Sequence, residues 1–133
     1  MVLGEKRSMT HKILFLLGMI FCHIVDDYYL QGWLASAKQK EWWTKNAPDP
    51  LYKYDYIMAL FMHSFSWTFS ITLLPTLYII IFGGSWYPIL FVGNVLLHMT
   101  VDDLKANKKK INLIQDQSVH LLQIVWTWFC YMF

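Results

Sequence analysis

Hydrophobic residues along this chain gather in four long runs that are separated by shorter polar stretches. A helix needs about 20 mainly apolar residues to cross the hydrocarbon core of a bilayer. Each run is long enough, so the pattern predicts an all-α, polytopic membrane protein: a four-transmembrane-helix bundle that forms a single membrane domain. The predicted helices cover residues 13–34, 56–82, 86–104 and 111–133.

The connections between the predicted helices set the expected topology. Residues 35–55 form a polar loop rich in Lys, Trp and Tyr, and residues 105–110 form a short basic turn. These two connections lie on one side of the membrane and carry eight lysines, whereas the side with both termini has Lys6, Arg7 and Lys12. The positive-inside rule therefore predicts termini outside and Lys-rich connections in the cytoplasm.

Composition supports a lipid environment. The chain is 56% hydrophobic and 15% charged, whereas an average soluble domain has about 25% charged residues. The net charge of +2 does not indicate nucleic-acid binding, because the basic residues only flank the apolar runs. The expected partners are membrane lipids.

Histidines are distributed in a way that favours a common site. Each predicted helix holds one of them: His23, His63, His98 and His120. Because successive helices alternate in direction, all four fall in the half of the membrane nearest the 35–55 loop.

Aspartates lie at the same depth in the membrane as these histidines and on the same helix faces. Residues four apart lie on one helix face, which pairs His23 with Asp27, His98 with Asp102, and Asp116 with His120. A charged group at this depth costs about 2.5 to 3.5 kcal/mol and is normally paired. Since the lysines lie only at the margin, the sequence predicts a divalent metal as the partner. The neighbouring Asp26 and Asp103 are expected to be interfacial or capping residues.

Zinc is the first choice of metal, with Mn or Fe as alternatives, because the ligands mix nitrogen and oxygen. The predicted metal ligands are His23, Asp27, His98, Asp102 and His120. Asp116 is expected as a catalytic base or further ligand. His63 is expected as a catalytic acid or ligand, and as the most peripheral member of the cluster.

Five spaced polar motifs are similar to a known family. They are H-x-x-x-D-x-x-x-Q at 23–31, a lysine at 38 or 40 after Leu34-Ala35, His63, H-x-x-x-D-x-x-K at 98–105, and D-Q-x-x-H at 116–120. Together they resemble domain-of-unknown-function family 3307, small membrane proteins of bacteria and their phages. That resemblance implies an architecture, in the bacterial inner membrane, and not an activity. A more distant similarity is to inner-membrane metal-dependent hydrolases, which also place H-x-x-x-D pairs on transmembrane helices.

The leading hypothesis is a membrane-embedded, metal-dependent hydrolase that acts on a phosphoester or lipid-linked substrate at the cytoplasmic leaflet. Gln31, Lys105 and Gln117 are expected to bind substrate, and the loop 35–55 is expected to cover the site.

Two other functions fit the same pattern. One is a proton or divalent-ion channel or transporter, which a stable homo-oligomer would favour. The other is a non-enzymatic phage or bacterial accessory protein that binds a host membrane partner, with the polar cluster only holding the helices together.

Overall fold

The computed structural model describes the backbone of residues 2–133, and the side chains from Met9 onward. The described chain is helical and contains no strand. Its long helices are α1 (Val2–Val25), α4 (Asp55–Phe82), α5 (Pro88–Ala106) and α6 (Leu113–Met132). The shorter elements are the π-helix η1 (Asp26–Leu30), α2 (Leu34–Ala37), α3 (Lys40–Asn46) and the 3₁₀-helix η2 (Pro50–Tyr52).

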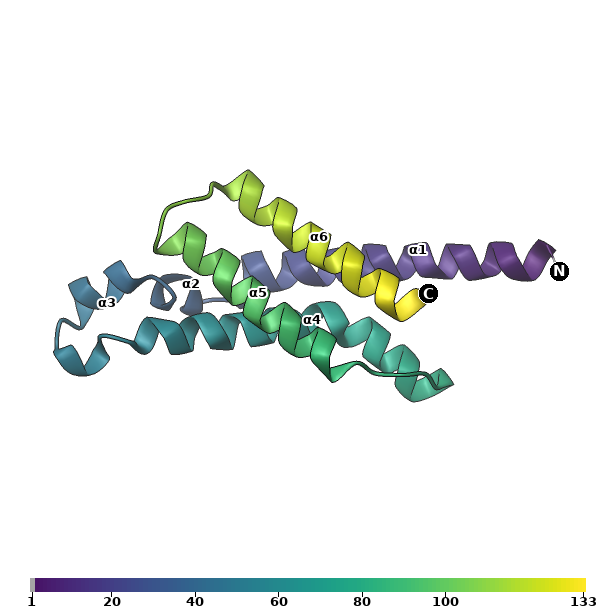
Figure 1. The fold of residues 1–133 in the computed structure, drawn as a ribbon, viewed down its shortest axis with the longest axis horizontal. Coiled ribbons are helices and arrows are strands. Elements are labelled where there is room, and N and C mark those ends of the chain that lie inside the picture. The colour runs from purple at the N-terminus through teal and green to yellow at the C-terminus, as the bar shows by residue number, and fades with distance from the viewer. Residues whose placement is uncertain (1) are drawn as a thin grey trace.

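The long helices alternate in direction along the bundle (Figure 1). Both chain ends and the connection 83–87 lie at one end of the bundle, whereas α2, α3 and the connection 107–112 lie at the other. Gly83 ends α4 with a positive φ of 82°, a conformation that glycine adopts without steric cost. At the opposite end, the Asn112 side chain and Gln115 form a capping box that begins α6.

Four helices were predicted to be long and apolar enough to cross a membrane, but only two segments of the described chain meet that condition by length and composition. They are Met9–Leu30 and Pro50–Phe82. Helix α5 carries Asp102, Asp103 and Lys105 near its end, and α6 carries Asp116, His120 and three glutamines. These polar residues lower the mean hydropathy of both helices.

Polar and apolar side chains are distributed in the reverse of the usual soluble pattern. Among the described side chains, 14 of the buried ones are polar or charged and 9 are hydrophobic. Large apolar side chains such as Phe21, Ile89 and Leu122 are 66%, 81% and 68% exposed. A small hydrophobic core of Met19, Trp67, Ile71 and Ile124 packs beside the buried polar residues in the bundle.

The π-helix η1 places two adjacent carboxylates in the interior. Asp26 and Asp27 are 1% and 7% exposed, because the wider π turn brings neighbouring positions onto the buried side. Asp26 was expected at the interface or as a cap, and this is wrong. Its Oδ1 accepts hydrogen bonds from Ser66 and Ser70 of α4, at 2.7 and 3.0 Å.

Residues 34–46, which form α2 and α3, are named the α2–α3 cover. The sequence predicted an irregular loop here, but short helices form instead. Asn107 at the end of α5 fixes this segment in two places: its Nδ2 donates to the Lys38 carbonyl at 3.1 Å, and its Oδ1 accepts from the Lys40 amide at 2.7 Å. Trp43 Nε1 also donates to the Ala37 carbonyl, at 2.6 Å.

Replacing Asn107 with alanine removes both of these bonds to the cover. We expect Asn107→Ala to lower the free energy of opening of residues 34–46 by about 1 to 3 kcal/mol, measured by amide hydrogen exchange. Asn46→Ala is the matched control, since the Asn46 amide donates only within its own helix, to the Trp42 carbonyl. Equal exchange in the two variants would contradict the role given to Asn107.

Candidate metal centre

The structure brings the four predicted histidines together, although each comes from a different long helix. His23, His63, His98 and His120 are all 2% exposed or less. The rings of His98 and His120 stack with their centroids 4.1 Å apart, and Trp67 stacks on His98 at the same distance and lies 5.4 Å from His120. The imidazoles therefore form one packed unit.

Two groups of side chains in the described chain have the spacing of metal ligands, and they share His98. The first group is His98, Asp102 and His120, whose ligand atoms lie within 4.8 Å of one another. His120 Nε2 is 3.3 Å from Asp102 Oδ1, and His98 Nε2 is 3.8 Å from the same oxygen. Metal–ligand bonds of about 2.0 to 2.1 Å in a tetrahedral site separate ligand atoms by about 3.3 Å, so this group fits a metal of zinc size.

The contacts of His120 place its inner nitrogen opposite two carboxylates. Nδ1 lies 3.3 Å from the Gln123 carbonyl oxygen, and because that oxygen can only accept, Nδ1 must donate. Nε2 faces Asp102 Oδ1 at 3.3 Å and Asp116 Oδ1 at 3.4 Å. Neither His120 Nε2 nor Asp116 Oδ1 has a hydrogen-bond partner among the described residues. In the neutral ring Nε2 carries a lone pair, and the three facing atoms then favour a cation between them.

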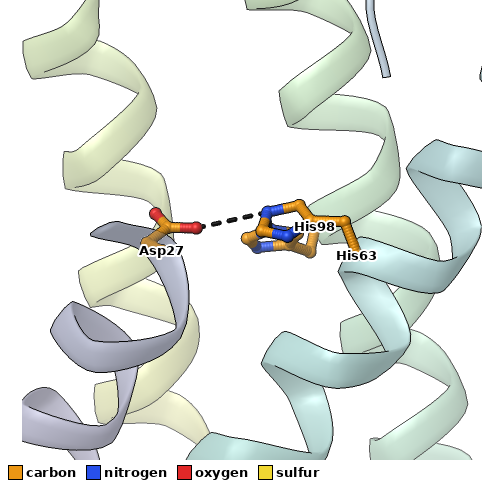
Figure 2. A group of neighbouring side chains, drawn as sticks. All are labelled: Asp27, His63 and His98. Carbon is orange, nitrogen blue, oxygen red and sulfur yellow. Dashed lines mark hydrogen bonds and ion pairs between the residues drawn. The ribbon is translucent and has the colours of Figure 1, made fainter. Parts of the chain in front are cut away.

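The second group is Asp27, His63 and His98 (Figure 2). His63 Nε2 lies 3.2 Å from Asp27 Oδ1, 3.3 Å from Asp102 Oδ2 and 3.3 Å from His98 Nε2. One N–H cannot donate well to three such atoms. His63 is thus the centre of the cluster, and the expectation that it is the most peripheral member is wrong.

His23, by contrast, lies outside both groups. Its Nδ1 accepts a hydrogen bond from Trp67 Nε1 at 2.7 Å, and its Nε2 faces Gln117 Oε1 at 3.0 Å and donates to it. Both nitrogens are satisfied in the neutral ring, and Asp27 Oδ2 lies 3.8 Å away. The ligand role predicted for His23 therefore fits His63 better.

Two lysines reach the carboxylates of the cluster. Lys38 Nζ from the α2–α3 cover is 2.6 Å from Asp102 Oδ2, and Lys105 Nζ is 2.6 Å from Asp116 Oδ2. Their side chains are 12% and 34% exposed. Each aspartate therefore gives one oxygen to a lysine and turns the other toward His120. The sequence had placed the lysines only at the margin and gave Lys38 no role of its own.

The glutamines expected to bind substrate are bonded to the protein itself. Gln31 Nε2 donates to the Asp27 carbonyl. Gln117 Nε2 lies within hydrogen-bond distance of Asp27 Oδ2 and Asp116 Oδ2, at 3.1 and 3.0 Å. Gln117 thus connects His23 to two carboxylates, and substrate binding by either glutamine stays a prediction.

A second layer of polar side chains extends the cluster toward the middle of the bundle. Gln123 Nε2 lies 3.2 Å from Asn94 Oδ1, and Asn94 Nδ2 donates to Thr127 Oγ1 at 2.8 Å. Neither Gln123 nor Asn94 was identified from the sequence. The signal was present, because Asn94 lies four residues before His98 and Gln123 three after His120, on the same helix faces.

Comparison with known proteins gave no match to a protein-family model, a curated protein or a solved structure. The resemblance to family 3307 therefore stays a prediction, and the argument about function rests on the geometry of the cluster.

The bond from Trp67 to His23 can be tested by a substitution that keeps an aromatic ring. Trp67→Phe leaves the buried Nδ1 of His23 without its donor, so we expect it to lower the free energy of unfolding by about 1 to 3 kcal/mol, measured by denaturation in detergent. Trp126→Phe is the control, because Trp126 is 61% exposed. If both variants lose the same stability, the hydrogen bond has no special role.

Proposed function

We propose that this chain is a four-helix membrane protein of the bacterial inner membrane. The most apolar windows of Met9–Leu30 and Pro50–Phe82 are only 22% and 28% buried within the structure. The core helices of a soluble protein would be mostly buried, whereas helices that face lipid expose their apolar side chains. The polar residues of α5 and α6 face the bundle interior, which is where charged groups are tolerated in membrane helices.

We further propose that the polar cluster binds a divalent metal ion. The observation that carries this proposal is the position of His120 Nε2, which faces an oxygen from each of two aspartates and has no hydrogen-bond partner among the described residues. Charge supports it as well: Asp27, Asp102 and Asp116 bring three negative charges, and Lys38 and Lys105 bring two positive ones. With neutral imidazoles, this leaves an excess of negative charge in a low dielectric, to which the buried Asp26 adds. Zinc fits these ligands, with Mn or Fe as alternatives.

The residues divide into proposed ligands and supporting groups. His98, Asp102 and His120 are the first set of ligands, with Asp116 as the nearest further donor. Asp27 and His63 form the adjoining set, which holds a second ion or accepts and returns a proton. A divalent ion in this place acts as a Lewis acid and lowers the pKa of water. Gln123 fixes the tautomer of His120, as an outer partner does in known metal sites.

The activity we propose is hydrolysis of a phosphoester, with a lipid-linked substrate at the cytoplasmic leaflet. Mixed His and Asp ligands and flanking lysines suit a substrate that carries phosphate. The similarity to inner-membrane metal-dependent hydrolases is in accord with this reaction. The α2–α3 cover lies over the cluster through Lys38 and controls access to it.

An ion pathway is less favoured by the same geometry. The polar network runs from Lys38 to Thr127, but at the depth of Ile71 and Ile124 the described interior is largely filled by the hydrophobic core. A conducting path needs polar or aqueous lining across the whole membrane. In the accessory-protein alternative, the cluster has a purely structural role. A measurement of metal binding separates that alternative from the proposed hydrolase.

Cobalt(II) titration in detergent tests the metal site, because bound cobalt has visible absorption bands that report its ligands. We expect His120→Ala and Asp102→Ala to weaken cobalt binding by more than about 100-fold, since even the loss of an outer partner costs about 10- to 100-fold. His11→Ala is the matched control, because His11 is exposed and lies outside the cluster. Wild-type protein that shows no cobalt spectrum, or an unchanged titration in His120→Ala, would contradict the proposal.

The proposed orientation places both termini outside and the α2–α3 cover in the cytoplasm. It rests on the count of basic residues, of which Lys6 and Arg7 lie outside the described side chains. With cysteines introduced at Ala47 and Ser85, an impermeant maleimide applied to intact cells should label position 85 and spare position 47. The reverse pattern of labelling means that the protein is inserted the other way round.

A further inference from the structure

We infer that Lys38 and Lys105 form a binding site for a phosphate group, and that this site becomes effective only when the metal is bound. The inference rests on the proposed function, and it names the chemical group that the site recognises and the order in which metal and substrate bind. It also gives a role to Lys38, which the sequence did not single out.

The geometry links the two ammonium groups to one histidine, because each contacts an aspartate whose other oxygen faces His120. Lys38 Nζ contacts Asp102 Oδ2 and Lys105 Nζ contacts Asp116 Oδ2, each at 2.6 Å. The other oxygens of these aspartates lie 3.3 and 3.4 Å from His120 Nε2. A metal bound to His120 and the two inner oxygens would leave both lysine contacts in place. Each ammonium group has three N–H donors, so donors are left for an anion.

The lysines are also the most accessible charged groups of the cluster. Their side chains are 12% and 34% exposed, whereas Asp102 and Asp116 are 3% and 0% exposed. A ligand that approaches from the side of the α2–α3 cover therefore meets the lysines first. Asn107 holds the Lys38 carbonyl and the Lys40 amide, and this fixes Lys38 over Asp102.

Charge makes the anion site depend on the metal. Without metal and with neutral imidazoles, the carboxylates of Asp27, Asp102 and Asp116 outweigh the two lysines, and the buried Asp26 adds to this excess, so the site repels an anion. One divalent ion shifts the balance by two charges in the positive direction. Because such charges act strongly in a medium of low dielectric, metal loading should convert a site that excludes phosphate into one that binds it.

Equilibrium binding of radiolabelled inorganic phosphate to the full chain in detergent tests this order. We expect zinc-loaded wild-type protein to bind phosphate at least about tenfold more tightly than the metal-free protein, as for a charge-assisted contact of ordinary strength. Lys38→Met and Lys105→Met should each weaken phosphate binding to the loaded protein by about 10- to 100-fold. Neither substitution should weaken metal binding, because each removes a positive charge next to an aspartate that is a proposed metal ligand.

Control variants separate this role from general loss of charge or of folding. Lys40→Met and Lys110→Met remove exposed lysines from the same two regions and should leave phosphate binding unchanged. Lys38→Arg should restore most of the binding lost in Lys38→Met, which shows that the segment still folds. If Lys38→Met and Lys40→Met bind phosphate equally, or if metal-free protein binds it as tightly as loaded protein, the inference is overturned.

Failure of the inference can be told apart from failure of the proposed function, because metal content is measured on the same samples. Loaded protein that does not bind phosphate ends the inference and leaves the metal site standing. Protein that takes up no metal ends both.

The source of the phosphate group is resolved by a second probe, a short-chain phosphatidic acid presented in the same detergent. Tighter binding of this lipid than of inorganic phosphate, with the same loss in Lys38→Met, assigns the site to a lipid headgroup. Equal binding assigns it to a soluble phosphate compound.

Discussion

The burial of charge in a medium of low dielectric is the constraint on which the rest of this structure depends. Asp102 and Asp116 are almost completely buried, and both face His120. Burying an unpaired charged group in the interior costs several kcal/mol of free energy, and an incomplete set of partners does not offset this cost. Several elements therefore contribute to the compensation: α4 through His63, α5 through Lys105, α6 through Gln117, and the α2–α3 cover through Lys38.

This constraint also explains why the bundle has a polar interior and an apolar surface. In lipid, apolar association between helices has little driving force, and polar contacts and close packing hold helices together instead. The stacked rings of Trp67, His98 and His120 supply the packing, while the hydrogen bonds of Gln123 and Asn94 supply the polar contacts. The side chains that would form the core of a soluble protein point outward.

Part of this arrangement could be predicted from the sequence, because it follows from helix periodicity. The spacing of four residues between His98 and Asp102, and between Asp116 and His120, places each pair on one face without any knowledge of the neighbours. The alternation of helix direction then gives the shared depth. The same reasoning yields the four long helices, although α5 and α6 are less apolar than the hydrophobic runs indicated.

What could not be predicted depends on how helices rotate and approach one another. His23 has an aspartate four residues later and His63 has none, so the sequence favoured His23 as a ligand, but the contacts of His23 with Trp67 and Gln117 place it outside the ligand groups. The π turn at Asp26 breaks the regular helical period. Lys38 lies in a segment that the pattern described as a loop, so its approach to Asp102 depends on the contact between that segment and Asn107.

The proposed function follows from the same balance of charge. A cluster with an excess of negative charge favours a cation, and a divalent ion in the cluster would favour an anion beside it. In this proposal, metal binding is connected to substrate binding without any large movement of the helices. The α2–α3 cover would then contribute through the lysine that it carries.

The central claim is that the cluster holds a metal ion in the native protein. Elemental analysis by mass spectrometry tests it most directly, on wild-type protein purified without chelators and without immobilised nickel. The account predicts about one to two divalent ions per chain, zinc first among them, as expected for six His and Asp donors of which about four bind one ion. Folded protein with no bound transition metal would contradict it, and the cluster would then serve only to hold the helices together.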